Sequence, residues 1–335
     1  MSNWKALMKE ISITEFENVK IGNAQDEEYA TGCTVILCEQ GAPAGVDVRG
    51  GGPASRETEL LNPSADCKAV HAVVLSGGSA FGLDAAGGVM EYLADKGVGL
   101  PVGDVLVPLV VQSCIYDLGF VSDKIKPDKA MAKKACENAE LNQPEEGNVG
   151  AGCGATVGKF AGMDFCMNSG LGMYAVELGD LKVGAIVSVN ACGDVYDEES
   201  GNILAGTLTP DKNGFVDSEL ALYQMYQQMS AMAKMQTEDK LVTNTTIGCI
   251  LTNAKFEKAQ LNKIAALAQN GYARCIRPVH TMMDGDTIYA LSTGDLVADI
   301  NVVGTMAARV MEQAVKNAVL HTSAFHDTKC AKDMD

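Results

Sequence analysis

The residues Asn244-Thr245-Thr246 stand where a charged stretch, "TEDKLV", meets an apolar run, "IGCILT". A threonine hydroxyl is a weak nucleophile until a base takes its proton, and a freed α-amino group is such a base. The unperturbed pKa of that amine, about 7.7–8.0, lies close to working pH, where general-base catalysis is efficient. Breaking the Asn244–Thr245 bond would place Thr245 at a new N-terminus, at the edge of a buried strand. The alternative is an ordinary strand start, which these three residues alone do not exclude.

A second stretch with possible chemistry is "GGSAFGLD", residues 77–84, between an apolar run and a helical pattern. A phosphate loop would need G-x-G-x-x-G or a G-K-[ST] ending, and a nucleophile elbow would need G-x-S-x-G. The stretch has none of these. We interpret it as a structural turn that lets a helix pack closely on a sheet.

His280, Asp284 and Asp286 could be imagined as metal ligands, but their spacing matches no established pattern. We interpret this stretch as an acid-rich turn capped by Gly285. The eleven cysteines are scattered and include no C-x-x-C pair, which favours reduced, buried thiols over a zinc site. We expect neither a metal nor a cofactor.

The elements that would position these residues alternate between strand and helix patterns, which indicates an α/β protein. The glycine-dense block "GNVGAGCGATVGKFAG" precedes two of the expected strands. We expect strands at 30–38, 171–178, 182–190 and 246–252, and a strand–turn–helix at 70–93. We expect helices at 218–236, 255–270 (ending at Gly271) and 304–320, and two strands around a turn at 271–294.

Composition narrows the function classes. The 335 residues carry a net charge of -17, which argues against nucleic acid or an anionic membrane surface as partner. No apolar run reaches the roughly 18 residues of a membrane helix, and the first residues lack the basic, apolar and small-residue pattern expected of a signal peptide. We therefore expect a cytoplasmic protein. Four methionines share one face of the expected helix 218–236, which favours core packing or a subunit contact; they are Met225, Met229, Met232 and Met235.

Six blocks, in order along nearly the whole chain, resemble one family: the self-cleaving DmpA-type aminopeptidases and their relatives, the nylon-oligomer hydrolases. No single block is persuasive, but the ordered set is specific. The blocks are "RGGGPASRETELL" (49–61), "VLSGGSAFGLDAAGGVMEYL" (74–93), "VGAGCGATVGK" (149–159), "VGAIVSVNACGDV" (183–195), "NTTIGCILTNA" (244–254) and "DGDTIYALSTG" (284–294).

The resemblance implies an αββα four-layer sandwich of the N-terminal-nucleophile type, with its own strand connectivity. It implies one hydrolase domain over 1–335 that cuts itself between Asn244 and Thr245. The resulting chains, 1–244 and 245–335, would stay associated. Members of the family tend to assemble, and together with the methionine face this favours a homo-oligomer of cleaved pairs.

Four residues are similar in position to polar groups of the family site: Thr245 to its nucleophile, and Asn190, Tyr116 and Lys159 to its supporting groups. Asn190 and Tyr116 would donate hydrogen bonds to the oxyanion, a role worth roughly 10²–10³ in rate per donor. Lys159 would supply positive charge that stabilises the tetrahedral state or lowers neighbouring pKa values. A solvated surface lysine is the alternative, but its Gly, Ala and Val neighbours favour burial.

Asp284 and Asp286 match a pair of polar positions beside the nucleophile, where they would hold the amine and the hydroxyl in place. The chain departs from the aminopeptidase branch in two ways. That branch has a glutamate, for binding the substrate amine, two residues before the tyrosine; this substrate-binding position is Cys114 here. It also uses a serine nucleophile. Both differences favour the nylon-hydrolase-like branch.

We therefore predict a self-processing threonine amidohydrolase that cleaves amide bonds of small peptides or amides. One alternative is an aminopeptidase that recognises the substrate amine through other groups. The second alternative is a small-ligand-binding member of the fold that never cuts itself.

Overall fold

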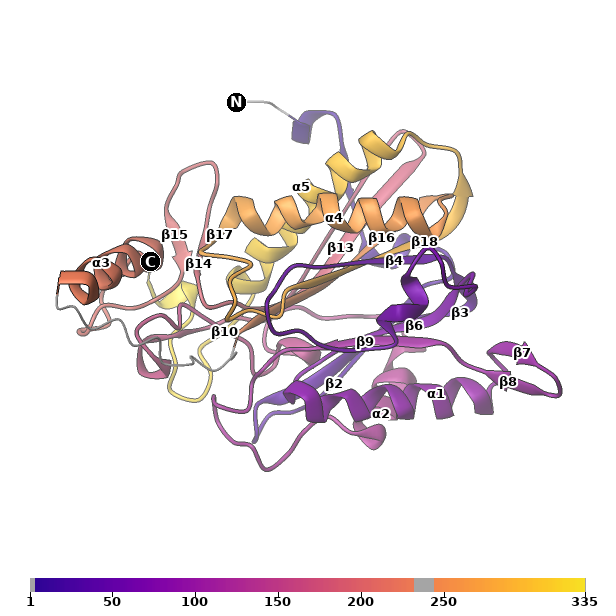
Figure 1. Ribbon diagram of the computed structural model, residues 1–335, viewed down its shortest axis with the longest axis horizontal. Helices are drawn as coiled ribbons and strands as arrows, with labels where there is room; N and C mark the ends of the chain where they lie inside the picture. Colours follow the sequence, from indigo (N-terminus) through magenta and orange to yellow (C-terminus); the bar gives the residue numbers. More distant parts are fainter. Residues whose placement is uncertain (1–3, 232–243, 335) are drawn as a thin grey trace.

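Two β-sheets form the middle of the molecule, each covered on its outer face by helices (Figure 1). The computed structural model describes residues 4–231 and 244–334. The first sheet pairs its strands in the order β1-β12-β13-β16-β18-β4, parallel between β16 and β18 and otherwise antiparallel. These strands are β1 (Lys9–Ile11), β4 (Ala44–Val48), β12 (Leu171–Leu178), β13 (Leu181–Asn190), β16 (Thr245–Ala254) and β18 (Thr287–Leu296).

The second sheet has the order β2-β3-β6-β9-β5, with β6 and β9 parallel. Its strands are β2 (Lys20–Asp26), β3 (Thr31–Ala42), β5 (Ala54–Arg56), β6 (Val70–Ser76) and β9 (Val110–Cys114). The helices are α1 (Ala85–Asp95), α2 (Lys129–Ala139), α3 (Ser218–Ala231), α4 (Lys258–Cys275) and α5 (Ile300–Leu320). Among the described residues, no helix combines the length and apolar character that a membrane crossing needs.

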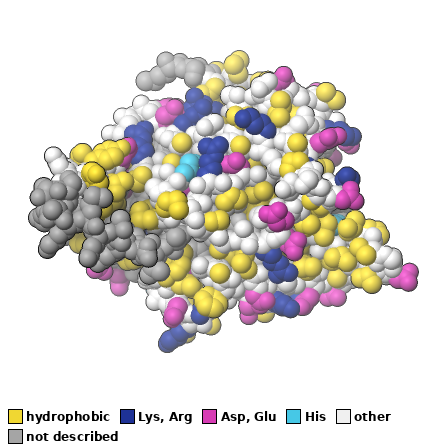
Figure 2. Space-filling model, viewed as in Figure 1, with side chains coloured by type: hydrophobic (Ala, Val, Ile, Leu, Met, Phe, Trp, Pro, Cys, Tyr) yellow, Lys and Arg dark blue, Asp and Glu magenta, His cyan; other side chains and the backbone are white. Residues whose placement is uncertain are grey.

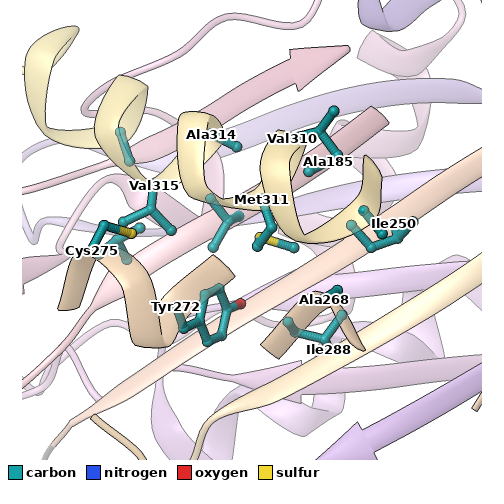
Figure 3. Packing of buried hydrophobic residues seen from close by; sticks show 14 of the residues in the cluster. Ala185, Ile250, Ala268, Tyr272, Cys275, Ile288, Val310, Met311, Ala314 and Val315 are labelled. Atoms are coloured by element: carbon teal, nitrogen blue, oxygen red, sulfur yellow. The ribbon is translucent and has the colours of Figure 1, made fainter. Parts of the chain in front are cut away.

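Three buried clusters of hydrophobic residues separate the four layers. One cluster lies between the two sheets and draws residues from β3, β6 and β9 on one side and from β13, β16 and β18 on the other. A second lies between the six-stranded sheet and α4 and α5, and includes Tyr272, Met311 and Ile250 (Figure 3). The third packs α1 and α2 onto the five-stranded sheet. This αββα arrangement confirms the predicted fold class.

Strand β16 carries Thr245 as its first residue and is buried on both faces. Ile247, Cys249 and Leu251 belong to the cluster between the sheets, whereas Ile250 belongs to the cluster under the helices. Side chains alternate between the faces of a strand. Thr245 therefore shares the face of Ile247, toward the second sheet, and Thr246 points toward the helices.

The remaining elements are short. The strands are β7 (Leu100–Val102), β8 (Val105–Val107), β10 (Thr156–Val157), β11 (Met167–Asn168), β14 (Asp194–Tyr196), β15 (Ile203–Ala205) and β17 (Ile276–Arg277). The 3-10 turns are η1 (Trp4–Ala6), η2 (Ile13–Glu15), η3 (Thr58–Leu61), η4 (Ser79–Asp84), η5 (Gly150–Gly152), η6 (Met163–Phe165) and η7 (Ala331–Asp333).

Most expected elements are present, but the end of α4 was predicted wrongly. The helix does not end at Gly271; it continues to Cys275, and the first of the two strands expected after it is reduced to β17. A Cβ at Gly271 would lie 2.7 Å from the carbonyl oxygen of Ala308 in α5. The glycine therefore allows two helices to approach closely and is not a stop signal. The expected helix 218–236 begins at Ser218, and its part beyond residue 231 lies outside the described residues.

Candidate active site

Thr245 lies at the point where the ends of three neighbouring strands meet. In the antiparallel pairing of β13 with β16, Thr245 stands directly opposite Asn190. On its other side, Asn244 forms an isolated parallel bridge with Asp284, just before β18 begins. Thr245 is 4% exposed and Asn244 is 2% exposed. The peptide bond between them is therefore held on both sides and is buried.

The carbonyl group of Asn244 contacts one hydroxyl that could attack it and one N–H that could stabilise the resulting charge. The hydroxyl of Thr245 is hydrogen-bonded to this carbonyl oxygen. The backbone N–H of Gly285 donates to the same oxygen at 3.0 Å. A fixed N–H directed at a carbonyl oxygen can stabilise the negative charge that develops there during nucleophilic attack. The arrangement can therefore support attack by the Thr245 hydroxyl on the preceding carbonyl carbon.

Gly285 was not identified from the sequence as part of a site. A Cβ at this position would lie 2.8 Å from Oγ1 of Thr245 and 2.8 Å from the carbonyl oxygen of Gly52. The glycine-rich 49–52 segment packs against this turn, since Gly52 N–H donates to the carbonyl oxygen of Asp284 at 2.9 Å. Only a residue without a side chain fits between the hydroxyl and this segment. The sequence signal was an ordinary turn glycine between two aspartates.

Asp286 fixes the backbone beside Thr245. Its Oδ1 accepts the backbone N–H of Thr246 at 2.8 Å, and its Oδ2 accepts the backbone N–H of His280 at 3.1 Å. The Nδ1 of His280 lies 2.9 Å from the same Oδ2. Because a carboxylate accepts, Nδ1 carries the proton in this contact. His280 thus orients Asp286, and no three-member cluster of His, Cys, Asp and Glu within the described residues is arranged to hold a metal ion.

The side chain of Asp284 is hydrogen-bonded to Thr281, within the same turn. Its Oδ2 accepts the backbone N–H of Thr281 at 2.9 Å and also the hydroxyl of Thr281. Burial, with the nearby carboxylate of Asp286 as a second cause, raises the pKa of Asp284. In the uncut chain neither aspartate is hydrogen-bonded to Thr245. Their predicted role, holding a free amine and hydroxyl, concerns the cut chain and stays a prediction.

Asn190 is held in one orientation by three neighbours. Its Oδ1 accepts Nζ of Lys159 at 2.7 Å and the backbone N–H of Thr156 at 3.1 Å. Its Nδ2 donates to the carbonyl oxygen of Tyr116 at 3.0 Å. Lys159 and the Thr156 N–H can only donate, so the amide oxygen must face them. This leaves a second N–H on Nδ2 for another acceptor, as an oxyanion donor requires.

Lys159 is half-buried, and its ammonium group also donates to the carbonyl oxygen of Asn190 at 3.0 Å. Its backbone is held by a hydrogen bond to the carbonyl oxygen of Cys192, just past the end of β13. Burial lowers the pKa of Lys159 to about 8. Lys159 is thus partly buried and contacts Asn190, whereas its predicted catalytic role stays a prediction.

Asp117 is a buried carboxylate that the sequence did not single out. It follows Tyr116 and accepts hydrogen bonds from the Thr31 hydroxyl at 2.6 Å and from Gly78 N–H at 2.7 Å. Burial raises its pKa to about 6. A Cβ at Gly77 would lie 1.8 Å from Oδ2 of Asp117. The glycines of "GGSAFGLD" thus make room for a carboxylate that anchors the segment carrying Tyr116.

Cys114 lies fully buried in β9. Its thiol contacts the hydroxyl of Ser76 at 3.1 Å and Nε2 of Gln112 at 3.5 Å. Burial raises the pKa of Cys114 to about 12, which keeps the thiol neutral. Its place as the substrate-binding position of the aminopeptidase branch stays a prediction, but it provides no negative charge for a substrate amine.

Comparison with solved structures agrees with the αββα architecture. A β-aminopeptidase of a Burkholderia species aligns with a TM-score of 0.64 at 18% identity, covering 95% of this chain and 89% of that one. The L-aminopeptidase D-Ala-esterase/amidase of Ochrobactrum anthropi, described as a variant of the Ntn hydrolase fold, aligns with a TM-score of 0.66 at 19% identity. That alignment covers 93% of this chain and 86% of the other. At these identities the likeness shows the fold.

Comparison with protein families and curated sequences goes further. The model of peptidase family S58 matches residues 12–331. A protein of Mycobacterium leprae named as an uncharacterized aminopeptidase is 34% identical over 86% of this chain and 80% of its own length. The 6-aminohexanoate-oligomer endohydrolase of Kocuria sp. is 31% identical over 91% of this chain and 84% of its own length. The chain therefore belongs to peptidase family S58 and is a hydrolase of peptide or amide bonds.

Proposed function

We propose that this chain cuts itself between Asn244 and Thr245, and that Thr245 then serves as the N-terminal nucleophile of an amidohydrolase acting on small peptides or amides. One observation carries the proposal. The Thr245 hydroxyl contacts the carbonyl oxygen of Asn244, and this oxygen also accepts the N–H of Gly285. Nucleophile, target and charge-stabilising donor are thus already assembled in the uncut chain.

In the self-cleavage step, Oγ1 of Thr245 forms a bond to the carbonyl carbon of Asn244. Negative charge on the former carbonyl oxygen is stabilised by Gly285 N–H. The C–N bond then breaks, and the proton from the hydroxyl ends on the departing nitrogen of Thr245. Water hydrolyses the resulting ester, which gives a carboxylate at Asn244, a free amine at Thr245 and the hydroxyl again.

In turnover, the freed amine accepts the proton of the Thr245 hydroxyl as it attacks the substrate carbonyl, and later passes a proton to the leaving amine. The spare N–H of Asn190 and the phenol of Tyr116 would bind the oxyanion. Lys159 holds the Asn190 amide in the required orientation and adds positive charge. Asp284 and Asp286 would fix the amine, since a nearby ammonium favours an ionised carboxylate.

Fragment analysis tests the self-cleavage. Purified protein should give two fragments with the masses of residues 1–244 and 245–335, and N-terminal sequencing of the smaller one should begin Thr-Thr-Ile-Gly-Cys. The same preparation should hydrolyse simple aryl amides. A smaller fragment starting elsewhere would assign the nucleophile to another residue. A single full-length chain would contradict the proposal.

An aminopeptidase that requires a free substrate amine is the alternative within the same class. A buried ammonium needs a carboxylate partner, because an unpaired buried charge is expensive. Cys114 provides no carboxylate, and its thiol is neutral. The curated relatives include both aminopeptidases and oligomer endohydrolases by name. We therefore expect an aminoacyl anilide and its N-acetyl derivative to be hydrolysed with kcat/KM values within roughly tenfold of each other, about 1.4 kcal/mol.

The comparison uses both substrates at equal concentration on one processed preparation. A hundredfold or greater preference for the free amine would favour the aminopeptidase instead. One of the two aspartates beside Thr245 would then be the first candidate for the amine anchor.

We also propose that the cleaved pairs assemble into a homo-oligomer in the cytoplasm. Hydrophobic side chains gather at both ends of the face seen in Figure 2, over α3 and over the β7–β8 hairpin. They include Leu220, Tyr223, Tyr226, Leu100, Val102 and Val105, all exposed. Of the methionine face, Met232 and Met235 lie outside the described residues. All eleven cysteines are free thiols, ten of them buried, as a reducing compartment allows.

A further inference from the structure

His280 stands next to the candidate active site and has an uncommon backbone conformation. Its φ angle is +59°, in the left-handed region that residues other than glycine rarely adopt. Histidine and asparagine enter this region more readily than most residues do. A strained backbone persists where the surrounding structure holds it, and such residues gather at functional sites. The contacts of His280 show what holds it in this conformation.

Two hydrogen bonds join His280 to a single oxygen of Asp286. The backbone N–H of His280 donates to Oδ2 at 3.1 Å, and its Nδ1 donates to the same oxygen at 2.9 Å. The other oxygen, Oδ1, accepts the backbone N–H of Thr246 at 2.8 Å. Asp286 is 1% exposed, and a buried carboxylate needs hydrogen-bond donors at its oxygens. His280 therefore supplies the donors for one oxygen, while the other oxygen holds the residue after Thr245.

The segment 280–286 is closed on itself and presents one backbone donor to the bond that would be cut. The first two residues of the segment supply hydrogen bonds to the carboxylates of Asp284 and Asp286. Gly285 lies between these aspartates, and its N–H donates to the carbonyl oxygen of Asn244 at 3.0 Å. The position of this donor therefore depends on both carboxylates staying bonded to the start of the segment.

The ring of His280 is braced from the side of α4. Its centre lies 6.1 Å from the ring centre of Tyr272, a fully buried residue of that helix. The side chain of His280 is 17% exposed, and its Nε2 is buried without a hydrogen-bond partner among the described residues. Within this part of the chain, no hydrogen bond joins the ring to Thr245. The ring can therefore act on Thr245 only through Asp286.

We propose that His280 is a positioning residue for self-cleavage. It holds Asp286, and Asp286 in turn fixes the Thr246 N–H and the turn that carries the Gly285 donor. The inference rests on the proposed function and adds to it a residue that contacts neither the nucleophile nor the bond that is cut. The role requires a backbone that tolerates the left-handed region and a side-chain donor at the place of Nδ1. Asparagine has both properties, whereas glycine has only the first.

The test compares full-length chains made by cell-free synthesis, so that self-cleavage is followed on a denaturing gel from the time of folding. His280→Gly keeps the left-handed backbone and removes the ring donor. It should slow self-cleavage by roughly tenfold to a hundredfold, because small displacements of reacting groups cost this much. His280→Asn should cut itself about as fast as the unchanged chain, because its Nδ2 is attached at the same place as Nδ1 and can donate to Asp286. In the processed fraction of His280→Gly, kcat for an anilide should fall while KM stays unchanged.

Lys212→Gly is the matched control, because Lys212 also has a left-handed backbone, with a φ of +55°, but is exposed in another loop; it should cut itself at the normal rate. Thermal unfolding checks that each variant is folded. If His280→Gly is not, His280→Asp replaces it, because an ionised aspartate has the shape of asparagine but no donor. Equal self-cleavage of the folded donor-free variant and the unchanged chain would overturn the role of His280, and so would a His280→Asn chain that cuts as slowly as the donor-free one. An unchanged chain that never cuts itself would instead count against the proposed function.

Discussion

Thr245→Ala is expected to leave one chain of 335 residues with no measurable amide hydrolysis. Alanine removes the hydroxyl that contacts the carbonyl oxygen of Asn244, so no group remains to attack that carbonyl. The Asn244–Thr245 bond then stays intact, and no α-amine forms to act as base. Thr245→Ser keeps a hydroxyl at the same place and should retain cleavage. Intact-mass measurement and an anilide assay on each purified variant give the result.

Thr246→Ala is the matched control for this experiment. Thr246 is the next residue, is equally buried, and has a hydroxyl with no hydrogen-bond partner. Its backbone N–H, which Asp286 holds, is unchanged by the substitution. Removing an unpaired buried hydroxyl costs little stability. Cleavage should therefore persist in Thr246→Ala; loss in this variant together with cleavage in Thr245→Ala would move the nucleophile by one residue.

Gly285→Ala is expected to block self-cleavage almost completely, although no functional group is removed. The new Cβ would lie 2.8 Å from Oγ1 of Thr245 and would push the hydroxyl and the Gly285 N–H away from the Asn244 carbonyl. A backbone donor of this kind is worth roughly 10²–10³ in rate, and displacing the nucleophile adds to the loss. The fraction of uncut chain, followed by mass over hours after purification, measures the effect.

Gly214→Ala provides the control for adding a methyl group to a glycine. A Cβ there would meet the Thr209 side chain only at 3.7 Å, which is ordinary contact. This variant should cut itself at the normal rate. Thermal unfolding of both variants separates a blocked reaction from a damaged fold. Normal processing in folded Gly285→Ala would remove Gly285 N–H from the self-cleavage step.

The sequence singled out most of the candidate site residues because they carry side chains with recognisable chemistry. Thr245, Asn190 and Lys159 were found through ordered blocks that resemble a family, and the structure brings them together. Strand patterns alone could not have paired residue 190 with residue 245, because register depends on partners distant in sequence. The apolar run after Thr245 did predict a buried strand there.

The sequence could not predict features that depend on backbone groups or on packing between distant segments. The donor at Gly285 is a backbone N–H, which leaves no trace in residue type, and "DGD" signals only a turn. Asp117 is a lone aspartate that would ordinarily be solvated; only the packing of Gly77 and Gly78 around it shows that it is buried. Gly271 was misinterpreted because close helix packing and helix termination both select glycine.

The order of strands in the six-stranded sheet has a consequence for the cut protein. β16 and β18 come from residues after 244, whereas their outer neighbours, β13 and β4, come from residues before it. The two strands from 245–335 thus lie between strands from 1–244 and are hydrogen-bonded to them on both sides. Separating the pieces would require unfolding, and reassembly would become a bimolecular reaction that slows on dilution. The uncut chain folds with both parts tethered, so the bond that the proposed maturation breaks would serve its structural purpose before it is lost.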